Sequence, residues 1–525
     1  MLIKKLFLTI FLALLLLPNT VQAKTKLLYI PLDNRPVCLS YVTQTIVAAG
    51  YEVTTPPEHL LASENHHGNP DALWNWLIKT IPTVDAAVLS TDSLLYGGLV
   101  ASRTHEFSTD TIHNRVERIA KLKNDFPLVK IYAFSTIMRT PRQSFGNVEP
   151  EYYTKYGPDL FKLTELNDKE ESLGLTKQEE HQRNLLKLNI PAIYLNDWFD
   201  RRQKNYEANL RLIKYSQTRS FHFFAIGKDD DAPLSQTHME SRHLTEAALL
   251  ASLNKFIILP GVDQLGLLLL TRAINDAEYK KPIVNVIYAD GVGKNTLPYY
   301  SDQRLSSSIP DQIGVAGGRA TEFLEEADLI LAVNAPYDGI TKDATYVDNL
   351  YFSSKANLKF AAQIKKLIRN KKDIALADVA YANGADNGFM LALHKEGLLE
   401  HLAAYSGWNT ADNTVGFALA QGLLSRAMTS QDKITLLHTR YLDDWLYQAN
   451  IRTDLRNYIN RRNPNIIYDL TPQHLRILAT TQRLYKDYLD EFKFLKQTSF
   501  DIDFPWNRLF EINIITNATK NDAKK

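Results

Sequence analysis

The chain has 525 residues, of which 45% are hydrophobic and 10% aromatic, and its formal net charge is +1. This length and apolar content predict two to four domains with sizeable cores, at about 150 residues per domain. The near-neutral charge argues against a nucleic acid or another polyanion as partner. The single cysteine, Cys38, excludes an internal disulfide, so packing must stabilise the fold.

The first residues have the layout of a cleaved export signal. Two lysines precede an apolar run from Leu6 to Leu17, and a small-residue site ending at Ala23 follows. The run is shorter than the roughly 20 residues that a membrane-spanning helix needs. We therefore expect residues 1–23 to be a signal peptide and the mature protein to be periplasmic or extracellular, with no membrane span.

Short apolar runs, several of them β-branched, recur between amphipathic stretches. Runs of this kind are typical of buried parallel strands in repeated βα units. The sequence therefore predicts an α/β protein, and we expect a (β/α) barrel-like parallel core with a helical C-terminal extension. Because there are more runs than an eight-stranded barrel needs, two doubly wound α/β domains are the alternative. The nine runs are LLYIPLD, AAVLSTD, KIYAFST, FHFFAIGKDD, KFIILPG, VNVIYAD, DLILAVN, DIALADVA and LAAYSGW.

Changes in composition suggest the domain limits. The segment from Asp290 to Ile313 has an excess of Gly, Pro and Ser and indicates a long loop or junction. After Ser430 the pattern becomes helical and charged. The expected divisions are a signal peptide at 1–23, an N-terminal α/β catalytic region at 24–290, a second α/β region at 291–428 and a helical C-terminal extension at 429–525.

Nearly every predicted strand ends in a polar residue. The carboxyl ends of parallel strands form the rim where ligands bind in α/β proteins. Each polar residue taken alone is equally well explained as a helix cap. Their recurrence favours a single functional rim. The polar ends are Asp33, Asp92, Ser135, Asp229, Asp263, Asp290, Asn334, Asp378 and Trp408-Asn409.

Two early motifs supply candidate binding groups. In PLDNRP, Asp33 ends a strand and Arg35 follows, and a guanidinium fork can hold a carboxylate or a sugar hydroxyl. The alternative is a pair that only fixes the loop. In TDSLLYGGLVASR, Asp92 and Tyr96 precede two glycines that allow a ligand to approach the backbone. No P-loop or dinucleotide fingerprint is present, so no cofactor is expected.

The stretch DDDAP places three aspartates, Asp229 to Asp231, at the end of a predicted strand. Neighbouring side chains on a strand point to opposite faces, so two of them converge only where the strand leaves the sheet. Two carboxylates in different surroundings have different pKa values, as paired acid/base chemistry requires. A solvated acidic turn and a hard-cation site are the alternatives. Because the DxDxDG spacing of a calcium loop is missing, no metal is expected.

Later segments add an aromatic and further polar groups. AYSGWNTADNTVG places Trp408 and Asn409 at a strand end, and YANGADNG places Asp386 in a glycine-rich loop. An exposed Trp beside hydrogen-bonding groups is typical of a sugar subsite, since a pyranose stacks on the ring. A core Trp with a helix cap is the alternative.

Five ordered motifs carry a resemblance over nearly the whole mature chain. With these motifs the chain resembles a bacterial family known only as a domain of unknown function, number four-one-two-seven. The motifs are LLYIPLDNRPVC, DDDAP, LPGVDQLGLLLLTRA, AYSGWNTADNTVG and FPWNRLFEI.

A second resemblance is local. FAIGKDD is similar to the strand ending in Trp-Asp-Asp of retaining β-N-acetylglucosaminidases of the O-GlcNAc hydrolase family, with Lys228 in place of the Trp. The resemblance implies that Asp229 orients the substrate's 2-acetamido nucleophile and that Asp230 is general acid and base. Trp408-Asn409 resembles that family's Trp-Asn motif, whose Asn contacts the sugar.

We therefore expect an exported carbohydrate-active enzyme, a glycoside hydrolase of the substrate-assisted, retaining N-acetylhexosaminidase kind. Its substrate would be a small molecule or oligosaccharide. A sugar-binding protein without turnover and a metal-dependent hydrolase are the alternatives. The catalytic residues would be Asp229 and Asp230. The substrate-binding residues would be Asp33, Arg35, Asp92, Tyr96, Asp263, Asp290, Asp386, Trp408 and Asn409.

Overall fold

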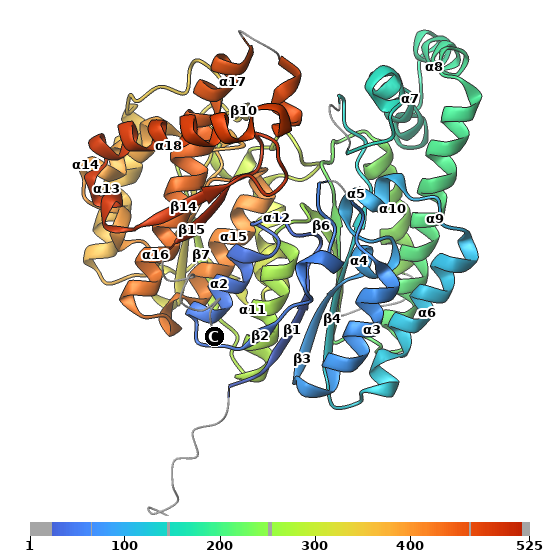
Figure 1. Cartoon of the computed structure of the whole chain (residues 1–525), viewed down its shortest axis with the longest axis horizontal. Coiled ribbons are helices and arrows are strands. Elements are labelled where there is room, and N and C mark those ends of the chain that lie inside the picture. The colour runs from blue at the N-terminus through green and yellow to red at the C-terminus, as the bar shows by residue number, and fades with distance from the viewer. Residues whose placement is uncertain (1–23, 65, 144–147, 250–254, 461–463, 517–525) are drawn as a thin grey trace, which may run out of the picture.

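The computed structural model describes residues 24–64, 66–143, 148–249, 255–460 and 464–516 (Figure 1). The expected signal peptide, residues 1–23, lies outside the described residues. Within them, no helix is both long enough and apolar enough to cross a membrane.

The first lobe contains a parallel sheet of six strands in the order β2-β1-β3-β4-β5-β6. Three of its strands, β1, β3 and β5, are buried along their whole length and β4 along nearly all of it, as expected for a parallel sheet covered on both faces. The strands are β1 (Leu27–Ile30), β2 (Val53–Thr54), β3 (Ala86–Ser90), β4 (Lys130–Ile137), β5 (Phe223–Lys228) and β6 (Phe256–Pro260).

The second lobe contains a parallel sheet of five strands in the order β13-β11-β9-β7-β8. Counted along the chain, this order is the same as that of the first five strands of the other sheet. It is the flavodoxin-like doubly wound order, in which ligands bind at the carboxyl ends of the strands. The strands are β7 (Ile283–Tyr288), β8 (Arg319–Thr321), β9 (Leu329–Asn334), β11 (Ile374–Asp378) and β13 (Ala404–Ser406).

The α/β class is confirmed, and each of the nine predicted runs contains a strand. The barrel-like core is corrected to the two-sheet alternative. In each sheet the strand order reverses, because β1 pairs with both β2 and β3, and β7 pairs with both β8 and β9. Each sheet therefore ends in two edge strands and stays open. Since β7 belongs to the second sheet, that lobe begins before the expected division at residue 290.

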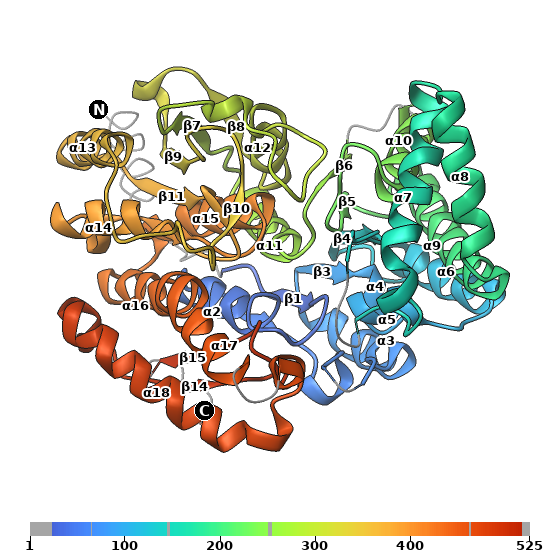
Figure 2. The ribbon, with the colours of Figure 1, turned by 90° about the horizontal axis from the view of Figure 1, so that it is seen from above.

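A shared layer of helices lies between the two sheets (Figure 2). α11 packs on β3 and β4 of the first sheet and also on α15, which packs on β9, β11 and β13 of the second. Most residues of α11 and nearly all residues of α15 are buried, as is typical of helices enclosed between two sheets. One hydrophobic core therefore spans both lobes. The layer consists of α2 (Ser40–Ala48), α11 (Leu265–Ala277), α12 (Leu305–Val315) and α15 (Ala411–Leu424).

Amphipathic helices cover the outer faces of both sheets. The charged segment between β4 and β5 contains α7 and α8, which pack together with their own small core. The remaining helices of the first lobe are α3 (Pro70–Thr80), α4 (Thr91–Leu95), α5 (Leu99–Thr104), α6 (Thr109–Asp125), α7 (Tyr153–Ser172), α8 (Lys177–Asn189), α9 (Ala192–Gln217) and α10 (Gln236–Leu249). Those of the second are α13 (Lys355–Arg369) and α14 (Asn387–Lys395).

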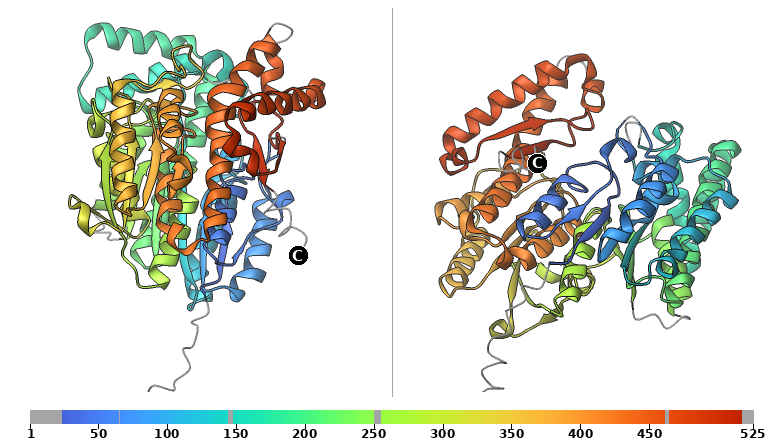
Figure 3. Two further views of the ribbon diagram at one scale, coloured as in Figure 1. Left: turned by 90° about the vertical axis from the view of Figure 1, so that its left-hand side faces the viewer. Right: turned by 60° about the horizontal axis from the view of Figure 1, so that its bottom comes forward.

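The C-terminal extension is largely helical, as predicted, and packs along the second lobe (Figure 3). A π-helical segment, Tyr441–Ile451, joins its first two helices. The sequence did not predict the antiparallel hairpin that closes the extension. Its elements are α16 (Ser430–Arg440), α17 (Arg452–Asn460), α18 (His474–Glu491), β14 (Phe500–Asp503) and β15 (Asn513–Thr516); a two-stranded pair, β10 (Lys342–Asp343) and β12 (Tyr381–Ala382), lies in the second lobe.

The shared core predicts a large effect of shortening Leu268, a fully buried side chain of α11. Leu268→Ala should lower the free energy of unfolding by about 2–5 kcal/mol, because it removes buried methyl groups and leaves a cavity. Urea unfolding measures this loss. Leu128→Ala is the matched control, since Leu128 is 93% exposed and its truncation should change stability little. Equal effects of the two substitutions would contradict a core shared by both lobes at α11.

Candidate functional site

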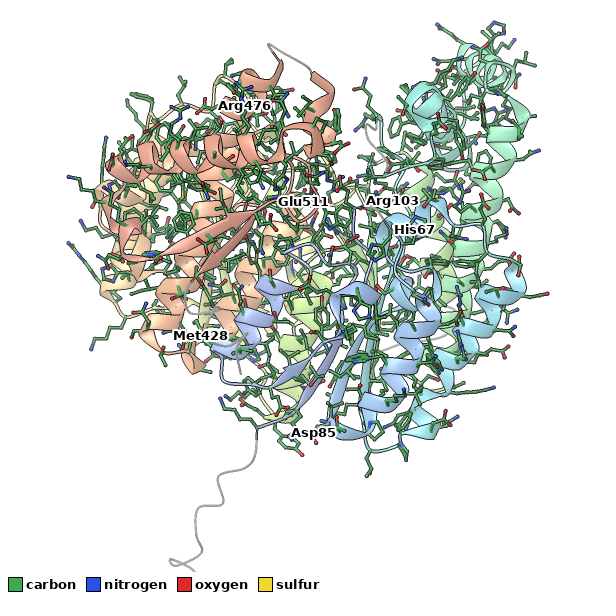
Figure 4. The ribbon with its side chains drawn as sticks, in the orientation of Figure 1. His67, Asp85, Arg103, Met428, Arg476 and Glu511 are labelled. Atoms are coloured by element: carbon green, nitrogen blue, oxygen red, sulfur yellow. The ribbon has the colours of Figure 1, made fainter. Side chains whose placement is uncertain are left out.

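A pocket of about 310 Å³ lies where strand ends of both lobes meet the C-terminal extension. This volume is at the lower end of the range for small-molecule sites. Arg103 and Glu511, from the first lobe and the extension, both line it and lie near the middle of the molecule (Figure 4). Its polar lining includes Asp33, Arg35, Arg103, Arg139, Asp229, Asp230, Asp263, Tyr300, Asn383, Asn409, Asn413, Arg452, Arg456, Arg508 and Glu511.

Arg35 links two strand ends of the first sheet on one wall of the pocket. Its Nε donates to both carboxylate oxygens of Asp33 at 2.9 Å, and one terminal nitrogen donates to Asp263 Oδ1 at 2.6 Å. All three side chains are buried. Burial raises the pKa of Asp263 although the Arg35 charge opposes the shift. The loop-fixing role considered for Asp33 and Arg35 therefore exists, and both residues also face the pocket.

Asp229 and Asp230 both line the pocket, although they are adjacent in the chain. β5 ends at Lys228, and Asp230 then adopts a left-handed backbone with φ of 39°. An Asp tolerates this conformation better than most residues do. The chain therefore leaves the sheet directly after β5, which is where the sequence predicted it to leave if Asp229 and Asp230 were to face the same pocket.

Each of these two aspartates has its own arginine. Arg103 donates to Asp229 at 2.6 Å, and Arg139 donates to Asp230 at 2.7 Å. Glu149 receives bonds from both arginines, at 3.4 Å from Arg103 and 2.6 Å from Arg139, and so joins the two pairs. The side chain of Asp229 is 6% exposed and that of Asp230 is 24% exposed, so Asp230 is the more accessible group.

Burial raises the pKa of Asp230, the Arg139 charge opposes the shift and the Asp229 charge adds to it.

The third aspartate of the triplet, Asp231, is outside the pocket lining. Asp231 lies 3.4 Å from Lys228 and accepts bonds from the Ala232 backbone and the Ser235 hydroxyl. The triplet is therefore not the solvated acidic turn considered as an alternative.

The expected aromatic platform is corrected. Trp408 is 1% exposed, and its ring packs in the core, 5.9 Å from that of Phe510. Its neighbour Asn409 does line the pocket. Another Trp, Trp506 of the extension, is among the lining residues, but it is 2% exposed, lies against the guanidinium groups of Arg35 and Arg508, and donates from Nε1 to Asn34 at 2.7 Å. A strand-end motif in the sequence does not reveal on which side of the sheet the ring packs.

Four more predicted residues are not among the described residues that line the pocket. Asp92 is buried and accepts a bond from Thr136. Tyr96 stacks on His105, Asp290 pairs with Lys359 on the surface, and Asp386 caps α14. The polar ends of the second sheet thus serve local structure more often than those of the first.

Sequence reasoning missed most of the arginines. Arg139 follows a strand end by two residues and could have been found by the rule that identified Asp92. Trp506 and Arg508 lie in FPWNRLFEI, which carried the family resemblance but no chemical hypothesis. Arg452 and Arg456 lie on a charged amphipathic helix, where no local pattern separates them from surface residues.

Within the described parts of the chain, no three His, Cys, Asp or Glu side chains are grouped so that they could hold a metal ion. The carboxylates of the pocket are held by arginines. The arrangement suits hydrogen bonding to a polar organic molecule that also carries negative charge.

The fold and site define a two-lobed α/β protein with an arginine-rich pocket between its lobes and a C-terminal extension. The chain belongs to the family described as "Protein of unknown function (DUF4127)", which matches residues 27–515. The first resemblance is thereby confirmed. No curated protein and no solved structure matches the chain, and the resemblance to the O-GlcNAc hydrolases is not confirmed.

Asp92 predicts a pH dependence of stability. Burial raises its pKa from 3.8 to about 7, so the folded protein holds this proton more tightly than the unfolded chain. Its contribution to stability is therefore present below about pH 4 and is lost as the pH rises to about 7. Asp92→Asn, which cannot ionise, should make this loss smaller by up to a few kcal/mol, since one pKa unit corresponds to about 1.4 kcal/mol.

Urea unfolding of both proteins between about pH 4 and pH 7 tests the Asp92 prediction. The difference between wild type and variant should change steadily over this range and level off above it. A difference that is independent of pH would contradict a buried, protonated Asp92.

Proposed function

We propose that this protein is an exported glycoside hydrolase whose active site is the pocket between the lobes. The observation that carries the proposal is the pair Asp229 and Asp230, which line one pocket in different electrostatic surroundings. Two carboxylates with distinct environments can divide the roles of acid and stabilising anion between them.

Asp230 is the candidate general acid and base. Its raised pKa favours a proton that can pass to the leaving oxygen of a glycoside, and it is the more accessible of the two carboxylates. Arg139, at 2.7 Å, then stabilises the carboxylate that remains. An acid of this kind is most effective when its pKa lies near the working pH.

Asp229 is the candidate orienting group. Its ion pair with Arg103, at 2.6 Å, fixes the carboxylate at the pocket wall. A fixed carboxylate next to the acid can align and polarise a reacting group of the substrate, which in the substrate-assisted scheme is the sugar's own 2-acetamido group. The side-chain amides of Asn409 and Asn413 supply partners for hydroxyl groups.

Export is part of the proposal and rests on the sequence of residues 1–23. Two lysines, an apolar run and a small-residue site follow one another as in a cleaved signal. An enzyme outside the cytoplasm would act on exogenous or cell-envelope sugars.

A sugar-binding protein without turnover is the second candidate. One observation favours it: among the described residues, every carboxylate that lines the pocket forms an ion pair with an arginine. Such pairs give a rigid recognition surface, and an ion pair lowers the tendency of a carboxyl group to act as an acid.

Asp230→Asn provides the main test. We expect this substitution to lower kcat on aryl N-acetylhexosaminides by about 100-fold or more, because general acid–base catalysis contributes about 10²- to 10⁴-fold. Steady-state hydrolysis by the purified mature protein measures it, across a panel of aryl glycosides. Asp231→Asn is the matched control, since Asp231 is in the same triplet but outside the pocket, and should keep its activity.

An Asp230→Asn protein with full activity would refute the mechanism. Sugars that bind in calorimetry without hydrolysis of any glycoside in the panel would support the binding protein instead.

A further inference from the structure

α17 contributes two arginines to the pocket, Arg452 and Arg456. They are four residues apart on the helix, so they lie on the same face, one turn from each other. Burial is the main cause that lowers the pKa of Arg452, and the charge of Arg456 adds to the shift, as expected for like charges. Like-charge pairs at this spacing destabilise a helix. An anion bound near both arginines would compensate for their repulsion.

The other four arginines of the pocket are all paired. Arg35, Arg103, Arg139 and Arg508 each form an ion pair with at least one carboxylate. Among the residues that the structure describes, neither arginine of α17 has a carboxylate within ion-pair distance. Six arginines and five carboxylates line the pocket, so its lining carries one excess positive charge, and the two arginines without an ion-pair partner among the described residues are those of α17.

Arg452 is the more informative of the two because it is only 4% exposed. One terminal nitrogen donates to the backbone carbonyl of Asn383 at 3.1 Å, and the guanidinium lies 5.3 Å from the ring centre of Phe510. Its Nε has no hydrogen-bond partner among the described residues. The negative charge of Asp343 attracts Arg452 from beyond ion-pair distance. The Asp343 carboxylate itself accepts hydrogen bonds from Asn383 and Thr345.

This environment is unfavourable for an arginine when the pocket holds no anion. A buried charge with no counter-charge in contact costs free energy, and burial lowers the pKa of Arg452 although the more distant Asp343 opposes the shift. An incoming anion would supply a counter-charge at contact distance and an acceptor for the unused N–H. Guanidinium forks hold carboxylates and phosphates through paired, charge-assisted bonds.

We propose that Arg452 and Arg456 form a subsite for an anionic group of the ligand, a carboxylate or a phosphate. Together with the proposed function, on which this last step rests, the subsite makes the substrate an acidic sugar. The anionic group would bind at α17, and the rest of the sugar would extend toward Asp229 and Asp230, which line the same pocket.

Isothermal titration of the mature, full-length protein tests the subsite. Glucuronate, glucose 6-phosphate and inorganic phosphate are the anionic probes, and glucose is the neutral one. We expect at least one anionic probe to bind more tightly than glucose and to bind more weakly as salt is added. The comparison of glucuronate with glucose 6-phosphate identifies which anion the subsite prefers.

Arg456→Gln should weaken binding of that anion by about 10- to 100-fold, the loss expected for charge-assisted hydrogen bonds, and leave glucose unaffected. Arg456 is exposed, so this variant should fold normally. Arg452→Lys, which keeps the charge but removes the fork, should weaken it as well. Arg476→Gln is the matched control, because Arg476 is an exposed arginine of α18 outside the pocket lining (Figure 4).

Equal weakening by Arg456→Gln and Arg476→Gln, or anionic probes that bind no more tightly than glucose, would overturn the subsite. The two proposals fail separately. Arg456-dependent anion binding in a protein that hydrolyses no glycoside leaves the subsite and refutes the hydrolase. Hydrolysis of neutral glycosides by a protein that does not bind the anionic probes would support the hydrolase and refute the subsite.

Discussion

A charge removed from water needs a counter-charge, and this requirement organises the centre of the molecule. Arg35 lies buried between Asp33 and Asp263, so the ends of β1 and β6 are held together by one guanidinium. Removing one partner of such a pair typically costs about 3–5 kcal/mol, because the remaining charge stays buried. For the same reason Asp229 forms an ion pair with Arg103, and Asp230 forms one with Arg139. The pocket is thus lined by side chains whose positions are fixed by their electrostatics.

The helix layer between the sheets is what allows this pocket to exist. Because α11 and α15 pack against one another and against both sheets, the two lobes share a core, and strand ends of both reach one pocket. The extension then returns to the first lobe, where the Tyr41 hydroxyl donates to Asp443 and accepts from the Ile514 backbone. Three parts of the chain that are distant in sequence therefore supply the lining, and none of them forms the pocket alone.

The paired and unpaired arginines divide the pocket into two chemical regions. Arginines of the first lobe fix carboxylates, which can act on a neutral part of a ligand. Arginines of α17 lack carboxylate partners among the described residues and can bind a charged part of the same ligand. A molecule with a polar body and one acidic group would satisfy both regions. This division connects the hydrolase that we propose with the acidic substrate that we infer for it.

The sequence by itself determined the α/β class, the nine strands and the pairing of polar residues with strand ends, because these features are local and follow from periodicity. It also singled out Asp229 and Asp230 as neighbours at a strand end. Only the tertiary structure decided that the strands form two open sheets, that Trp408 is in the core and that Trp506 lines the pocket. It alone brought Arg452 to the pocket. These outcomes depend on which faces pack together and on contacts across hundreds of residues, and no local pattern encodes them.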